Sequence, residues 1–400
     1  MEKKKILFVV NNFNIGGPQK SLLSLLYKIN FDYYEVSILS LSAEGKLMKH
    51  LPNEVSVITP DSTVNYAILA PKIFIRKTIK FLLSSNFKLA FKAILTVLLG
   101  FMKKNMTEQK QKFWVENKKK LPKLNQEFDV AIGVSGGHSI MFVVDCVRAR
   151  KKIGWIRSDY RVLKRNVEID RPYFQTIDSI LSVSHLCKNI FLSIFPETEE
   201  KIIVMYNVSP FKMYRNIPVN TKSMKKSEET TNLLTICRLD PNKGLDLAIE
   251  ALEILVKKNN KVVWYVLGEG SYRKKLEKMI YQKGLQNYFI LLGAHLNTGE
   301  FIKNTDILVH PSRFEGKSNV IDEAKQLLKP IVATNFETVH EQIVHEKTGL
   351  ISNMNARDLA KCILRVKKED YLVQKFKRNL AFDMYDDTES LNIFQKIIEE

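Results

Sequence analysis

The feature of this 400-residue sequence that most limits its possible folds is a recurring unit made of a short apolar run, a glycine-containing turn and a helix start. The first copy is Lys5–Val10, a run typical of a buried parallel strand, followed by Gly16, Gly17 and then Pro18 as a first helical residue. A strand that leads through such a turn into a helix predicts the opening of a doubly wound α/β sheet. We expect each half of the chain to carry its own series of these units.

The length and composition allow two or three globular domains with sizeable cores, since 45% of the residues are hydrophobic and 26% are charged. We predict an N-terminal domain over 1–208, a linker over 209–231, a second domain over 232–382 and a terminal helix over 383–400. The strands expected after the first from the apolar runs are Tyr34–Leu41, Val55–Ile58, Phe128–Val134, Lys201–Asn207, Asn232–Cys237, Val262–Leu267, Ile290–Gly293 and Ile307–Val309.

The net charge of +19 is concentrated in the first half, where residues 1–210 hold 32 Lys and Arg against 18 Asp and Glu. Within an insert at about 64–124 there are 14 basic residues and two acidic ones. Two helices are predicted there, each with a basic face and a broad apolar arc, a pattern that favours an anionic membrane surface. The alternative is two ordinary domain helices with solvated lysines. The basic positions at helical spacing are Lys72, Arg76 and Lys80 in one helix, and Lys88 and Lys92, with Thr96, in the next.

Other sequence features bear on the compartment. The four cysteines are far apart and form no CxxC pair, which favours a reducing compartment and disfavours structural zinc. The apolar run Ile6–Val10 is too short for a signal peptide, and Ala93–Met102 is too short to cross a bilayer. We therefore expect a cytoplasmic protein that associates peripherally with the inner face of the cell membrane.

The chemistry is predicted to lie in His310–Glu323, where a short strand leads through a glycine-containing loop into a helix that begins near Ser318. Unpaired backbone N–H groups and the helix dipole at such a point favour binding of an anion, most naturally phosphate. Glu315 and Glu323 flank this point and suit sugar or ribose hydroxyls. The alternative is that Glu315 is a capping acid and Glu323 a solvated helix residue.

A second set of candidates follows the strand at Asn232–Cys237, where Arg238 and Lys243 precede Gly244 and a helix. Arginine offers a fork to two phosphate oxygens and lysine a mobile point charge, so the pair suits a diphosphate. The alternative is two surface cations near a turn. In the first half, His138 follows a strand and two glycines, at the sheet edge where α/β folds bind ligands, although a lone histidine is often structural.

Taken together, these segments resemble the retaining glycosyltransferases of family 4, the glycosyl transferases group 1. The resemblance rests on His310–Ser312, on Glu315 and Glu323 with seven residues between them, on the following Ala324, and on the segment Thr235–Leu252. It implies a GT-B architecture, in which two doubly wound Rossmann-like domains face each other across a cleft and a C-terminal helix crosses back to the first domain. This sequence departs from the family pattern at four positions: Gln19 stands where an acid is frequent, Arg157 replaces a histidine, Val208 replaces a proline, and Cys237 replaces a glycine.

The resemblance also implies roles for individual residues. Catalytic roles fall on His138, Arg238, Lys243 and Glu315, with Glu315 on the transferred sugar and Glu323 on the ribose. The implied contacts to the donor nucleotide-sugar are Gly16, Gly17, Arg238, Lys243, Gly268, Gly293, Ala294, Glu315, Gly316, Lys317, Ser318, Asn319, Val320 and Glu323. The implied acceptor contacts are Arg157 and Asp159.

The function expected from this resemblance is the retaining transfer of a sugar from a nucleotide diphospho-sugar, with UDP favoured, to a lipid-linked glycan of a bacterial surface polysaccharide such as capsule, O-antigen or teichoic acid. No Asp-x-Asp pair occurs, so no cofactor or metal is expected. The alternatives are a nucleotide-sugar 2-epimerase of the same fold and, from a different class, a basic membrane- or nucleic-acid-binding protein without catalysis. Nucleic-acid binding is disfavoured because the basic residues alternate with an aliphatic face rather than with exposed aromatics.

Overall fold

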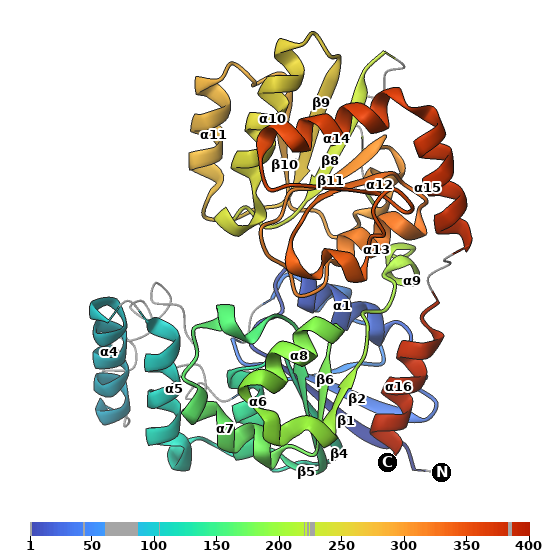
Figure 1. Ribbon diagram of the computed structural model, residues 1–400. Coiled ribbons are helices and arrows are strands. Elements are labelled where there is room, and N and C mark those ends of the chain that lie inside the picture. Colours follow the sequence, from blue (N-terminus) through green and yellow to red (C-terminus); the bar gives the residue numbers. More distant parts are fainter. Residues whose placement is uncertain are drawn as a thin grey trace. The chain divides into compact units, whose positions relative to one another are not determined.

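The computed structural model describes residues 2–42, 45–60, 87–103, 105–219, 221, 224, 229–382 and 386–400. The chain forms two compact units, one of Met1–Tyr206 with Ser390–Glu400 and the other of Asn207–Glu389. Each unit is built on a parallel sheet with helices between its strands, which confirms the predicted doubly wound α/β fold (Figure 1).

The sheet of the first unit has seven parallel strands in the order β3-β2-β1-β4-β5-β6-β7. Strands β2 and β3 lie on one side of β1, and β4 to β7 lie on its other side. The strand order therefore reverses between β1 and β4. Most of these strands are apolar and buried because helices cover both faces of the sheet. The strands are β1 Lys4–Val10, β2 Tyr34–Ser40, β3 Ser56–Ile58, β4 Glu127–Val134, β5 Arg148–Ile156, β6 Ser179–Ser182 and β7 Ile202–Val204.

Local signals explain where the helices of the first unit begin. Pro18 lies in the first turn of α1, Asn166 accepts a hydrogen bond from the amide of Ile169 at the start of α7, and Ser184 does the same for Cys187 in α8. One large apolar cluster then joins α5, α6, α7 and α8 to the sheet. The helices are α1 Gly17–Leu26, α4 Phe87–Met102, α5 Met106–Asn117, α6 His138–Cys146, α7 Val167–Thr176, α8 His185–Ile194 and α16 Thr388–Glu399.

The C-terminal helix α16 belongs to the first unit although it follows the whole of the second. Phe394 stacks on Phe8 of β1 with ring centroids 6.1 Å apart, and the Tyr34 hydroxyl donates to Glu399 at 2.8 Å. The terminal helix expected over 383–400 corresponds to α16, and α15 ends before it at Phe382. A new helix starts at α16, where Asp386 accepts a hydrogen bond from the amide of Thr388.

The basic insert is described only in part. The helix expected around Lys72, Arg76 and Lys80 lies outside the described residues. The next one is α4, which packs against α5 (Figure 1). Its Ile94 and Val97 pack against the core of the first unit. An exposed apolar stripe remains along α4, formed by Phe91, Leu95, Leu98 and Met102. No helix among the described residues is long and apolar enough to span a membrane.

The sheet of the second unit has six parallel strands in the order β10-β9-β8-β11-β12-β13, with the reversal between β8 and β11. The strands are β8 Thr231–Ile236, β9 Val262–Leu267, β10 Phe289–Gly293, β11 Ile307–His310, β12 Ile331–Thr334 and β13 Leu350–Ser352. The helices are α9 Phe211–Tyr214, α10 Leu245–Lys257, α11 Arg273–Gln282, α12 Gly299–Lys303, α13 Asn319–Gln326, α14 Ala356–Lys368 and α15 Asp370–Phe382.

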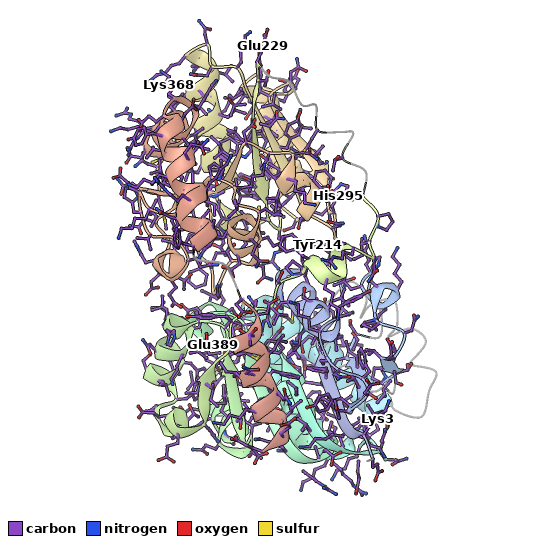
Figure 2. All side chains as sticks on the ribbon, turned by 90° about the vertical axis from the view of Figure 1, so that its right-hand side faces the viewer. Lys3, Tyr214, Glu229, His295, Lys368 and Glu389 are labelled. Carbon is purple, nitrogen blue, oxygen red and sulfur yellow. The ribbon has the colours of Figure 1, made fainter. Side chains whose placement is uncertain are left out.

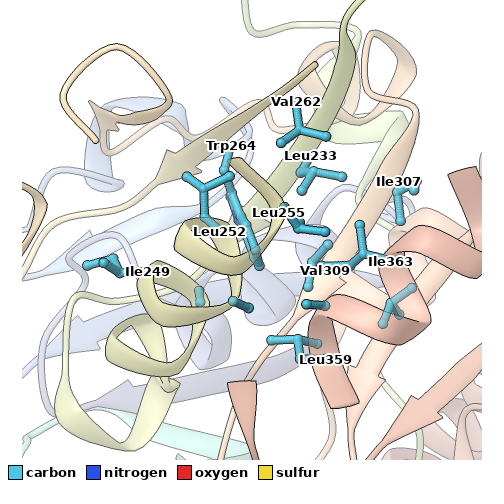
Figure 3. Close-up of a cluster of buried hydrophobic side chains, with 14 of the residues drawn as sticks. Leu233, Ile249, Leu252, Leu255, Val262, Trp264, Ile307, Val309, Leu359 and Ile363 are labelled. Carbon is cyan, nitrogen blue, oxygen red and sulfur yellow. The ribbon is translucent and has the colours of Figure 1, made fainter. Parts of the chain in front are cut away.

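Apolar clusters cover both faces of this second sheet. On one face, Trp264 and Val309 of the strands meet Leu252 of α10 and Ile363 of α14 (Figure 3). On the other face, α12 and α13 pack through Phe301 and neighbouring apolar side chains. The sheet is thus held rigidly at its centre, and the loops at the carboxyl ends of β8 and β11 start from fixed points.

The segment expected to be a linker is partly structured. Its short helix α9 buries Met213 and Tyr214, and the Asn297 side chain donates to the backbone carbonyls of Tyr214 and Ile217 at 3.2 and 2.8 Å. Figure 2 labels Tyr214 on this helix and His295 on the loop after β10. The apolar side chains of α9 therefore make it part of the second unit rather than a flexible connection.

Candidate active site

The most developed polar cluster lies at the reversal point of the second sheet. Lys243 follows β8 and its ammonium lies 2.7 Å from Oε1 of Glu315, which follows β11. His310, the last residue of β11, places its Nε2 3.0 Å from the same oxygen. The three side chains are between 3% and 18% exposed. Parallel α/β sheets bind ligands at this point because the loops of the two central strands diverge there.

The cluster fixes the charge of Glu315. Burial alone would raise the pKa of this carboxyl, but the charge of Lys243 and the hydrogen bonds from His310 and Lys243 outweigh burial and lower the pKa to about 2. Because the folded pKa lies below the unfolded one, this carboxylate stabilises the fold above the ordinary carboxyl pKa, and the contribution is lost as the pH falls toward 2. At neutral pH the site thus holds a fixed anion that orients a lysine ammonium.

Two glycines allow the loops around this cluster to pack closely. Gly244 has φ +63°, and a Cβ there would lie 1.9 Å from the carbonyl oxygen of Pro311. Gly268 has φ +153°, and a Cβ there would lie 1.7 Å from the carbonyl oxygen of Cys237. The loops after β8, β9 and β11 therefore touch backbone to backbone, which any other residue at these two positions would prevent.

Arg238 occupies the same sheet edge in a different way. Its side chain is 72% exposed and lies 3.7 Å from Asp240, so it is a surface cation on the loop after β8. Gly268, Gly293 and Ala294, whose backbone was predicted to contact the donor, also lie at this edge. The amide of Gly268 donates to the carbonyl of Gly293 at 2.8 Å, and Ala294 is the next residue. The structure thus brings together the predicted positions after β8, β9, β10 and β11.

The start of α13 is more occupied by the protein than the sequence indicated. Ser318 caps the helix, but its own amide donates to the Gln342 side chain at 2.9 Å. The ammonium of Lys317 is buried and lies 2.6 Å from Asp322. The side chain of Asn319 accepts a hydrogen bond from Asn207. Gly316 and Val320 lie in the same stretch. These contacts hold the loop in place. The Ser318 amide and the Lys317 ammonium, both expected to face phosphate, are therefore already bonded within the protein.

Glu323, expected to bind ribose hydroxyls, is only 1% exposed. Its Oε2 accepts hydrogen bonds from the Thr298 hydroxyl at 2.6 Å and from the Tyr214 hydroxyl at 2.9 Å. Burial, followed by the negative charge of Glu323, raises the pKa of Tyr214 well above its ordinary value, so the phenol keeps its proton. Tyr214 and Thr298 were not predicted from the sequence, because one lies in an expected linker and the other on a short loop without a motif.

In the first unit, the predicted residues also lie at the carboxyl edge of the sheet. The Asn11 side chain donates to the carbonyl of Gly136 at 3.5 Å, so the loop that leads to Gly16 and Gly17 meets the loop that leads to His138. His138 is buried beside Trp114, with ring centroids 5.7 Å apart. Burial, and then the charge of Arg165, lowers the pKa of His138 to about 3, so its ring is neutral.

The two acceptor candidates have different surroundings. Asp159 caps the turn after β5 and accepts hydrogen bonds from the amide, Nε and Nη2 of Arg161 at 2.6 to 2.8 Å. Its carboxylate is therefore engaged within the protein. Arg157 instead lies over the ring of Trp155, 4.3 Å from the ring centroid. Among the described residues, no group of three or more His, Cys, Asp or Glu side chains is placed to hold a metal ion.

Two parallel doubly wound units, the second with a lysine–carboxylate cluster at its reversal point, define the GT-B class of glycosyltransferase folds. Staphylococcus aureus TarM, solved as a mutant with Fondaparinux, alpha-GlcNAc-glycerol and UDP, has a TM-score of 0.67 and 18% identity, with 99% of this chain and 100% of that chain covered. Anabaena HepE, solved with UDP, has a TM-score of 0.65 and 15% identity, with 99% of each chain covered. The predicted GT-B fold is thus confirmed.

At the level of sequence, residues 216–381, which lie within the second unit, match the family described as Glycosyl transferases group 1. The poly(ribitol-phosphate) alpha-N-acetylglucosaminyltransferase of S. aureus is 28% identical over 194 residues, which are 48% of this chain and 38% of that protein. An uncharacterized glycosyltransferase of Methanocaldococcus jannaschii is 28% identical over 247 residues, which are 57% of this chain and 63% of that one. The matches thus span less than two thirds of these relatives.

Proposed function

We propose that this protein is a retaining hexosyltransferase that moves a sugar from a nucleotide diphospho-sugar to a glycan acceptor of a cell-surface polysaccharide. The observation that carries the proposal is the contact of Lys243 and His310 with Glu315 at the reversal point of the second sheet. The unit that holds this cluster is also the one that matches the glycosyltransferase family, and the named relatives are transferases, which favours transfer over epimerisation. UDP is the favoured nucleotide, as two solved proteins of this fold bind it.

The step that needs assistance is departure of the diphosphate, because negative charge builds up on its oxygens as the glycosidic bond breaks. In this proposal Lys243 and Arg238 supply positive charge there, and Glu315 holds Lys243 in position while it meets hydroxyls of the transferred sugar. The loss of one such fixed charge costs about 3 kcal/mol, or on the order of 100-fold in rate. Glu323 binds the ribose from a position fixed by Tyr214 and Thr298.

Retention of configuration follows in this proposal from a same-face reaction, in which the departing phosphate oxygen takes the proton of the acceptor hydroxyl. No side chain then has to act as a base. This is consistent with the neutral ring of His138 and with the carboxylate of Asp159, which is hydrogen-bonded to Arg161. Cationic side chains take the place of a bridging metal, so we propose metal-independent transfer.

We further propose that the acceptor is lipid-linked and that the protein works in the cytoplasm on the inner face of the membrane. The support is the apolar stripe on α4, whose members Phe91, Leu95, Leu98 and Met102 are 46% to 78% exposed. Lys92 and Lys103 lie on or next to this helix, and such basic amphipathic helices bind anionic lipid surfaces. The four unpaired cysteines suit a reducing compartment.

The donor is first identified by a screen of nucleotide sugars for hydrolysis and for thermal stabilisation of the protein. With that donor, Lys243→Ala and Arg238→Ala should each lower transfer by about 100-fold or more, because the developing phosphate charge loses a cation. Lys257→Ala is the matched control, since this exposed lysine of the second unit pairs with Glu253 on the surface of α10. Thermal unfolding of each variant shows whether the fold is intact. Near wild-type transfer by both site variants would refute the assignment of the diphosphate site.

A further inference from the structure

Arg157 is a buried cation that pairs with no acid among the described residues. It follows β5 at the carboxyl edge of the first sheet, and it is 8% exposed. Its Nε and Nη1 atoms are buried and have no hydrogen-bond partner among the described residues. A buried charge is normally paired, because taking it out of water without a partner is strongly unfavourable.

The next three arginines along the chain follow the usual pattern. Arg165 pairs with Asp170, Arg171 with Glu197, and Arg161 with Asp159. Asp159 lies only two residues after Arg157, yet its carboxylate is directed to Arg161 through three hydrogen bonds. Within the part of the chain that the structure describes, Arg157 thus has no counter-ion although an acid is nearby in sequence.

The surroundings of Arg157 hold its guanidinium in place. The guanidinium carbon lies 4.3 Å from the ring centroid of Trp155, a cation–π distance. The indole Nε1 of Trp155 is also buried and has no hydrogen-bond partner among the described residues. This stacked pair therefore presents three buried donor nitrogens that have no acceptor among the described residues. Burial lowers the pKa of Arg157 to about 9, so the side chain still carries its charge at neutral pH.

We propose that Arg157 binds an oxyanion, a phosphate or a carboxylate, carried by the acceptor at the carboxyl edge of the first sheet. This inference rests on the proposed glycosyl transfer and deepens it, because it makes the acceptor an anionic molecule rather than a neutral sugar. A guanidinium can hold two oxygens of a phosphate or carboxylate at once, and an oxyanion supplies the acceptors that the three donors lack. The diphosphate of the donor has its own cations, Lys243 and Arg238, in the second unit.

The test compares acceptors that differ only in the anionic group, using the donor found in the screen. One pair is a lipid diphosphate-linked sugar and the same sugar on a neutral alkyl chain, and another is a polyol-phosphate chain and the free polyol. Arg157→Met keeps the length of the side chain but removes its charge. It should lower kcat/KM for the anionic acceptor of a pair by about 100-fold or more, whereas kcat/KM for the neutral acceptor should stay within a few-fold of the wild-type value. Arg157→Lys keeps the charge but loses the forked guanidinium, so its kcat/KM for the anionic acceptor should lie between the values of the wild type and of Arg157→Met. The pair that shows the loss identifies whether the phosphate belongs to a lipid or to a polymer.

Arg150→Met is the matched control, because Arg150 lies on the same strand at its amino end, is largely exposed and pairs with Asp129 at the surface. Its kcat/KM should equal that of the wild type. A second readout does not depend on turnover. Inorganic phosphate should raise the Tm of the wild type and of Arg150→Met by more than it raises the Tm of Arg157→Met, which keeps only the cations of the second unit; the Tm of Arg157→Met without phosphate should be no lower than that of the wild type.

Equal losses on anionic and neutral acceptors, or the same stabilisation by phosphate in Arg157→Met as in the wild type, would overturn the inference. A loss that depends instead on a carboxylate in the donor sugar would also overturn it. Absence of transfer by the wild type with every donor and acceptor would refute the proposed function, and the phosphate-dependent Tm would then still decide whether Arg157 binds an anion.

Discussion

At the residue scale, Glu323 shows how a buried carboxylate can be prepared for a ligand. The Thr298 and Tyr214 hydroxyls both donate to its Oε2, so the carboxyl group is held in one orientation before any ligand binds. The two hydroxyls also contact each other at 2.7 Å. Such a network specifies one arrangement because each member would otherwise be buried with an unsatisfied polar group.

Replacing Tyr214 with Phe tests this arrangement. The substitution removes a hydrogen bond to a charged group, which contributes about 1.5 kcal/mol or more, so KM for the donor should rise about 10-fold while kcat changes less. Steady-state kinetics with the screened donor measure both constants. Tyr281→Phe is the control, because Tyr281 is 73% exposed on α11. An unchanged donor KM in Tyr214→Phe would show that Tyr214 does not position Glu323 for the nucleotide.

The sequence predicted the residues that follow strands better than the contacts they make. Lys243 and Glu315 could be placed at one edge because each follows a strand and precedes a helix. Whether Lys317 faces a ligand depends on a partner five residues away, Asp322, and the occupation of the Ser318 amide depends on Gln342 from another segment. Such pairings arise from tertiary packing, which no local pattern of residues specifies.

At the element scale, α4 combines an apolar stripe with basic neighbours. Leu95 and Leu98 are 46% and 54% exposed, and the burial of each leucine in a lipid interface contributes about 1.5 kcal/mol or more. The double substitution Leu95→Ser with Leu98→Ser should therefore weaken binding to anionic vesicles about 10-fold or more. Co-sedimentation with phosphatidylglycerol vesicles measures this affinity. Val344→Ser, at an exposed position in the second unit, is the control, and unchanged binding by the double variant would contradict a role of α4 at the membrane.

The helix α16 is an element whose packing can be measured as stability. Phe394 is 4% exposed and stacks on Phe8, so Phe394→Ala removes a buried aromatic ring and should lower the free energy of unfolding of the first unit by about 3 to 5 kcal/mol. Urea unfolding followed by fluorescence measures this change. Phe382→Ala at the end of α15, where the ring is 89% exposed, should have little effect. Equal stability of the two variants would show that α16 is not part of the folded core.

The strands were easier to predict than the helices of this chain. A strand buried on both faces is a continuous apolar run, so β1, β8 and β9 were predicted to within a residue. The terminal helix expected over 383–400 begins at Thr388 in the structure, where the Asp386 side chain accepts a hydrogen bond from the Thr388 amide. The linker expected over 209–231 contains α9, whose four residues are too few to produce a periodic pattern.

At the scale of the whole molecule, the proposed chemistry depends on side-chain cations and not on a metal ion. Transfer should therefore proceed at an unchanged rate in excess EDTA, because Lys243 and Arg238 neutralise the leaving diphosphate. The measurement is the initial rate with and without chelator after dialysis. Loss of activity in EDTA that manganese restores would contradict this prediction, whereas loss that manganese does not restore would indicate damage to the protein.

The first unit is discontinuous in sequence, since it needs Ser390–Glu400 as well as Met1–Tyr206, whereas the second is one uninterrupted segment. During synthesis on a ribosome, the second unit can therefore be completed while Phe8 still lacks the helix that covers it. The first unit is complete only when Ser390–Glu400 have also been made. The order of completion is thus the reverse of the order of translation, and loss of a few residues at the C-terminus would damage the part of the protein that was made first.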